Sequence, residues 1–61
     1  MKTIEITFTG KQAVITTTTE TELTIQRVKY QTALLWMSKQ GKPWTWITLE
    51  DSTEQATWSR D

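Results

Sequence analysis

The first part of the chain alternates between polar and apolar side chains over residues 3–9. The apolar side chains on one side of this segment are Ile4, Ile6 and Phe8. Such alternation is typical of a β-strand with one buried face. The pair Gly10–Lys11 follows, and glycine at the first central position favours a two-residue type II′ turn. Residues 12–19 then form the return strand of a predicted β-hairpin, which is expected to bury Ala13 and Ile15.

The middle of the chain contains the signals of a helix and of its end. Residues 33–40 are rich in helix-forming residues. Gly41 stands where a helix C-cap belongs, and Pro43 follows two residues later. These signals predict a helix over roughly residues 24–40.

A different interpretation of the same segment makes residues 23–38 two strands. The segment contains β-branched residues, but its apolar phase flips between Ile25 and Val28, which would require a bulge. It also contains no glycine, proline, asparagine or aspartate at which the chain is expected to reverse. Thr19 and Glu22 have the spacing of a capping box, which favours the helix.

The last third of the chain predicts a second hairpin. Residues 43–49 alternate and are rich in aromatic side chains, residues 50–53 suit a turn, and residues 55–59 suit a returning strand. A short helix over residues 52–60 is the alternative. The predicted fold is therefore α+β, a single domain of residues 1–61 with a four-stranded sheet and one packed helix in the order ββαββ. The alternative fold is a small all-β barrel of five strands, SH3-like or OB-like.

The element order and several short motifs resemble β-grasp domains. The motifs similar to ubiquitin-like proteins are Thr9–Lys11, Thr24–Lys29 and Gly41–Pro43. Those similar to the immunoglobulin-binding domains of proteins G and L are Thr17–Glu20 and Trp44–Trp46. The resemblance implies a β-grasp fold and a protein-binding role.

The composition excludes most reaction chemistry. The chain of 61 residues has no histidine and no cysteine, so it lacks the commonest general base, the thiolate nucleophile and the usual zinc ligands. It has only two glycines, which form no phosphate-binding loop. The sequence therefore predicts a protein that is not an enzyme and that uses no metal and no cofactor.

The charge and hydropathy patterns also limit the partners. The seven basic and seven acidic residues give a net charge of zero, which disfavours non-specific binding to duplex DNA. The chain has no apolar run long enough to cross a membrane, and its first residues lack the apolar stretch of a signal peptide. These patterns predict a soluble, cytoplasmic protein with no membrane partner.

The predicted helix has a second apolar stripe, which consists of Ile25, Val28, Leu35 and Trp36. A sheet covers one stripe of a helix, so the second is expected to contact a partner. Nearby basic residues complete the predicted binding site, which consists of Ile25, Arg27, Val28, Lys29, Trp36 and Lys39. The sequence thus predicts a small non-enzymatic binding module that contacts a protein partner, or a second copy, through its helix or an edge strand. A phage or mobile-element inhibitor and an engineered scaffold are examples of such modules.

The alternative function is binding of single-stranded nucleic acid by the barrel. The segment from Leu23 to Leu49 contains four basic residues and no acidic one, and Tyr30, Trp36, Trp44 and Trp46 lie among them. Aromatic side chains interleaved with cations can stack on bases while the cations contact phosphates.

Overall fold

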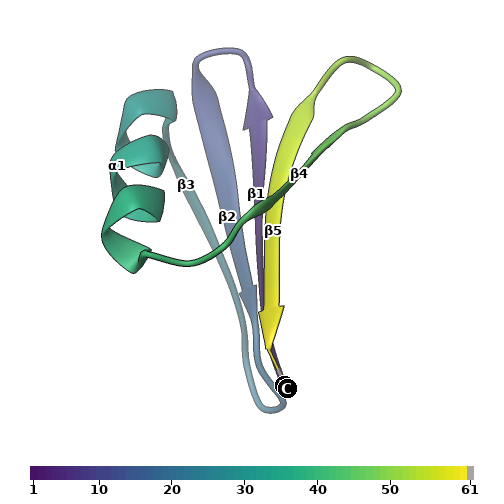
Figure 1. Cartoon of the computed structure of the whole chain (residues 1–61). Helices are drawn as coiled ribbons and strands as arrows, with labels where there is room; N and C mark the ends of the chain where they lie inside the picture. The colour runs from purple at the N-terminus through teal and green to yellow at the C-terminus, as the bar shows by residue number, and fades with distance from the viewer. Residues whose placement is uncertain (61) are drawn as a thin grey trace.

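The computed structural model describes residues 1–60, so Asp61, the last residue of the predicted domain, lies outside the described part. The described residues form an antiparallel five-stranded sheet and one helix, so the fold class is α+β (Figure 1). The elements are β1 Lys2–Thr9, β2 Gln12–Thr18, β3 Leu23–Lys29, α1 Tyr30–Gln40, β4 Thr45–Thr48 and β5 Glu54–Arg60. The strands lie in the order β3-β2-β1-β5-β4.

Both predicted hairpins are present. The β1–β2 register pairs Thr9 with Gln12 and leaves Gly10–Lys11 as a two-residue turn, in which Gly10 has a φ of +62°. This positive φ at the first central position is the one that a type II′ turn requires. The strand predicted over residues 55–59 is confirmed as β5, so the alternative short helix at the end of the chain is wrong.

The prediction of four strands is wrong because residues 23–29 form β3 rather than the first half of a helix. The reason lies in the preceding turn. The Thr19 N–H donates to the Glu22 carbonyl at 2.8 Å, and the Glu22 N–H donates to the Thr19 hydroxyl at 3.0 Å. The two residues with capping-box spacing therefore close a β2–β3 hairpin, since a threonine hydroxyl can accept the same local hydrogen bond in a turn.

The change of apolar phase in β3 needs no bulge. Val28 pairs with Ala13, and Ile25 pairs with Thr16, in one continuous register with β2. Residues an odd number of positions apart in a strand point to opposite faces. Val28 is accordingly half-buried against the core, whereas Ile25 lies on the opposite face and is exposed.

The helix α1 begins at Tyr30, directly after β3. The Tyr30 N–H donates to the Lys11 carbonyl at 2.9 Å, which ties the start of the helix to the β1–β2 turn. Gly41 ends the helix in the left-handed conformation with a φ of 61°, as the sequence predicts. Because residues 30–40 are helical, the alternative all-β barrel is also wrong.

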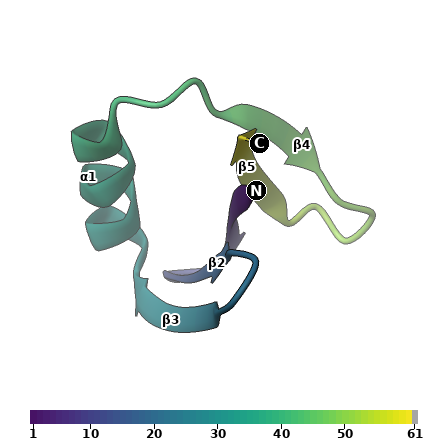
Figure 2. The same ribbon diagram turned by 90° about the horizontal axis from the view of Figure 1, so that it is seen from below.

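The core lies between α1 and one face of the sheet. Its buried residues are Ile4, Ile6, Phe8, Ala13, Ile15, Ala33, Met37 and Ala56. In Figure 2, α1 and the segment that joins it to β4 lie on the same side of the sheet. That segment is held by Trp44, whose indole N–H donates to the Met37 carbonyl at 3.4 Å. The Lys42 ammonium also lies 4.1 Å from the centre of the Trp58 ring. We call the opposite side of the sheet the open face.

The β4–β5 turn contains a strained residue, which gives a first testable result. Ser52 has a φ of +67°, a conformation that costs a residue with a Cβ atom about 1 kcal/mol. Ser52→Gly is therefore expected to stabilise the domain by about 0.5–1 kcal/mol. Ser59→Gly, in the extended part of β5, is the matched control and is expected to destabilise it by a similar amount. Thermal unfolding of both variants measures the difference, and a loss of stability in Ser52→Gly would contradict the strain.

The same turn has a structural carboxylate. The Asp51 carboxylate accepts a hydrogen bond from the Thr53 N–H at 3.0 Å. The Thr53 hydroxyl and then this N–H stabilise the ionised form and hold the pKa of Asp51 below its ordinary value. Asp51 is thus a turn residue that stays ionised at neutral pH.

Candidate functional site

The outer edge of β3 carries backbone groups that have no partner strand among residues 1–60. In an antiparallel pair, residues alternate between backbone groups that point toward the neighbouring strand and groups that point away. The bonds from Thr19 to Glu22 and from Tyr30 to Lys11 show that even-numbered residues of this segment bond toward β2. The N–H and C=O groups that point outward therefore belong to Leu23, Ile25, Arg27 and Lys29.

The side chains of these four residues lie together on the open face. They alternate along β3, and none of them is buried. Leu23 is 62% exposed and Ile25 is 65% exposed, which is high for large aliphatic side chains in a strand. The edge thus presents two apolar side chains followed by two basic ones. We call these residues, Leu23, Ile25, Arg27 and Lys29, the β3 edge.

The positive charge of the β3 edge is not neutralised locally. Within residues 1–60, neither Arg27 nor Lys29 forms a salt bridge. The nearest acids in sequence, Glu20 and Glu22, lie in the turn at the opposite end of β3. Glu20 pairs there with the amino group of Met1 at 2.9 Å, and both groups are exposed. The segment from the turn to the end of β3 therefore runs from acidic through apolar to basic.

The structure separates the six predicted site residues into two groups. Ile25, Arg27 and Lys29 lie together on the β3 edge. The other three lie elsewhere. Val28 packs on the core side of β3, and Trp36 is half-buried, with its ring centre 6.1 Å from that of Trp44. Lys39 is exposed in the last turn of α1. The predicted helical stripe of Ile25, Val28, Leu35 and Trp36 is wrong, because Ile25 and Val28 lie in β3 on opposite faces of the sheet and only Leu35 and Trp36 belong to α1.

Leu23 is the edge residue that the predicted site omits. Its signal in the sequence is the spacing of two between Leu23 and Ile25, two large aliphatic residues that a strand would place on one face. A helical interpretation of the segment hides this spacing, because it groups residues three or four positions apart.

The other sheet edge, β4, is a weaker candidate. It is four residues long, and the bond from the Leu49 N–H to the Thr53 carbonyl shows that Trp46 and Thr48 point their backbone groups outward. Trp46 is 48% exposed, but its ring stacks on Phe8, with ring centres 5.5 Å apart. This edge therefore offers fewer free backbone groups than β3.

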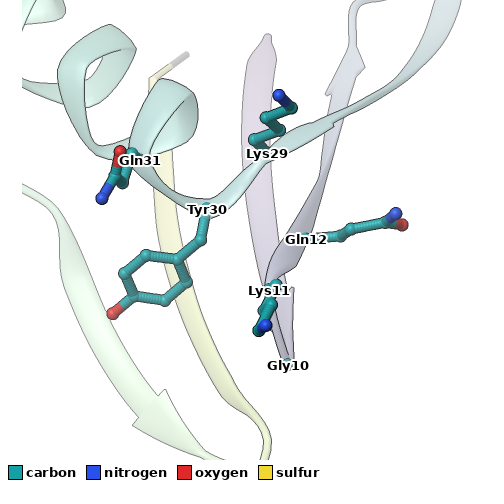
Figure 3. A pocket seen from close by; sticks show the side chains of 6 residues that line it. All are labelled: Gly10, Lys11, Gln12, Lys29, Tyr30 and Gln31. Carbon is teal, nitrogen blue, oxygen red and sulfur yellow. The ribbon is translucent and has the colours of Figure 1, made fainter.

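An aromatic and basic depression lies beside the end of β3 (Figure 3). Its lining residues are Gly10, Lys11, Gln12, Lys29, Tyr30 and Gln31. Tyr30 is 37% exposed, and its ring also contacts Phe8, with ring centres 5.0 Å apart. The depression is therefore lined by one partly exposed aromatic ring and two lysines.

Residues 1–60 contain no group of three or more carboxylates that could hold a metal ion. No helix among them is long and apolar enough to cross a membrane. Comparison with protein-family models, with curated proteins and with solved structures finds no match to this chain. The resemblance to β-grasp domains therefore stays a prediction.

Proposed function

We propose that this chain is a small non-enzymatic protein-binding domain that takes an extended segment of its partner onto the β3 edge. The observation that carries the proposal is the row of outward backbone groups on a seven-residue strand with exposed Leu23 and Ile25. In binding by strand addition, backbone hydrogen bonds supply affinity and alternate side chains supply specificity.

The simplest competing explanation is that β3 is merely an uncovered edge. Proteins usually protect such edges with bulges, proline, charge or short length. β3 has a continuous register with β2 and contains no proline. Its two charges lie in its second half, so the half that contains Leu23 and Ile25 has no such protection. An edge that is charged at one end and apolar at the other favours a partner strand that binds in one defined direction.

The side chains of the β3 edge indicate the chemistry of a matching strand. In an antiparallel complex, acidic residues would lie opposite Lys29 and Arg27, and apolar residues would lie opposite Ile25 and Leu23. A synthetic peptide with the sequence Glu-Thr-Glu-Thr-Val-Thr-Val has this pattern. The peptide in which lysine replaces both glutamates is its matched control.

Titration of the labelled protein with these peptides, followed by backbone amide NMR, tests the proposal. The acidic peptide is expected to shift the amide signals of the β3 edge and to bind about tenfold more tightly than the lysine peptide. Arg27→Glu is expected to abolish this preference, because the β3 edge then presents one acidic and one basic residue. Lys39→Glu, a charge reversal on α1, is expected to leave the preference unchanged. Absence of any shift in β3, or a response confined to β4, would contradict the proposal.

Binding of single-stranded nucleic acid is the second candidate, and the depression around Tyr30 is the observation that favours it. The same titration with a ten-nucleotide oligothymidine separates the two functions. Signals that move only around Lys11 and Tyr30, without a response of the β3 edge to either peptide, would favour nucleic acid and contradict strand addition.

A further inference from the structure

We infer that the strand bound by the β3 edge is β3 of a second copy of this chain, paired antiparallel about a two-fold axis at Ile25. This inference rests on the proposed function, because it uses the same edge. The two copies would form one continuous sheet across the axis. Such a contact is isologous, since the same residues of both copies form it.

The order of charges along the chain supports pairing with a second copy. Glu20 and Glu22 precede β3, and Arg27 and Lys29 end it. In an antiparallel pair, the acidic start of each copy lies beside the basic end of the other. Glu22 of each copy, together with Glu20, whose carboxylate also pairs with the Met1 amino group of its own chain, thus brings negative charge beside the basic end of the other copy. The two contacts are identical by symmetry.

The backbone restricts the registers that are available. Outward groups belong to odd-numbered residues, so odd residues of one copy must pair with odd residues of the other. With the axis at Ile25, the two Ile25 side chains face each other on the open face. Lys29 of each copy then lies opposite Thr21 of the other, between its Glu20 and Glu22.

The neighbouring registers fit less well. With the axis at Gln26, the two Arg27 side chains become diagonal neighbours, roughly 7 Å apart, and repel each other. With the axis at Thr24, Lys29 of one copy lies opposite Thr19 of the other, past Glu20 and Glu22. Fewer residues of the two β3 strands then pair with each other. The axis at Ile25 keeps the two Arg27 positions roughly 13 Å apart along the strand while leaving Lys29 beside the acids.

A contact made by one edge strand of each copy is small, so the dimer is expected to be weak. Interfaces at the low end of the usual size range are typically transient. Sedimentation velocity of the full chain at increasing concentration is therefore expected to show monomer that shifts to dimer in the micromolar to millimolar range. High salt is expected to weaken the dimer, because the charged groups involved are exposed.

Two charge-reversal variants test the pairing. Lys29→Glu places an acid beside Glu20 and Glu22 of the second copy, and the double variant Glu20→Lys with Glu22→Lys places bases beside Lys29. Each variant alone is expected to dimerise at least about tenfold more weakly than the original chain. An equimolar mixture of the two restores opposite charges at both ends of the interface. It is therefore expected to form a heterodimer, which native mass spectrometry identifies by its mass.

The control is Lys39→Glu, which reverses a charge on α1 and is expected to dimerise like the original chain. A monomer at every concentration, or variants that fail to recover dimerisation when mixed, would overturn the inference. If the chain stays monomeric but the acidic peptide still shifts the β3 edge, the partner is a different protein, and strand addition is retained. If neither a second copy nor the peptide affects β3, the proposed function fails as well.

Discussion

Replacement of Ile6 by alanine is expected to destabilise the domain by about 3 kcal/mol, within the range of buried Ile→Ala changes. Ile6 is 0% exposed at the centre of β1, where it pairs with Ile15 of β2 and Ala56 of β5. Since Ala56 is small, it cannot fill the cavity. A domain of 61 residues has a total stability of roughly 3–9 kcal/mol, so this loss is a third of it or more.

Urea unfolding followed by tryptophan fluorescence measures this loss, and Ile25→Ala is its control. The substitution is chemically identical, but Ile25 is 65% exposed on the open face. Its expected cost is about 0.5 kcal/mol, the usual size for an exposed position. Equal losses in the two variants would contradict the division of the sheet into a core side and an open face.

The β1–β2 and β4–β5 hairpins could be predicted because their signals are local. The alternation around Ile4, Ile6 and Phe8, together with Gly10, specifies a strand and a turn without reference to distant residues. Gly41 likewise marks the helix end by its own conformation. In each case the decisive residues are neighbours in sequence.

The third strand could not be predicted because its state depends on pairing with β2. Leu23–Lys29 has no periodicity that excludes a helix, and the helix-forming residues that follow it extend the helical pattern backwards. The turn before it is equally ambiguous, since Thr19 and Glu22 have the same spacing in a capping box and in the observed hairpin turn. The pairing of all seven residues of β3 with β2 decides that this segment is a strand rather than a helix.

The candidate site was predicted in part for a related reason. Ile25 belongs to the predicted site through an expected helical stripe, and Arg27 and Lys29 belong to it as basic residues near that stripe. Which residues are grouped together therefore depends on the secondary structure. A strand brings these three residues together with Leu23, whereas Trp36 and Lys39 belong to the helix.

Proline at position 26 is expected to destabilise the domain strongly, whereas proline at position 25 is expected to cost little stability. Gln26 pairs with Ile15, and its N–H is one of those that bond toward β2. Gln26→Pro removes this bond and places the ring against β2. We therefore expect a loss on the order of 3 kcal/mol, as for proline at other hydrogen-bonded interior positions. The Ile25 N–H points outward, so Ile25→Pro is expected to cost about 1 kcal/mol or less.

The pair of proline variants also tests the β3 edge as an interaction site. If strand addition is correct, folded Ile25→Pro loses an outward donor at the centre of the edge and no longer binds the acidic peptide or a second copy. Urea unfolding and amide NMR of the same samples measure both effects. A larger loss of stability from proline at position 25 than at position 26 would reverse the assignment of inward and outward groups. The interaction edge would then have to present Thr24, Gln26 and Val28, whose side chains lie on the core side of the sheet.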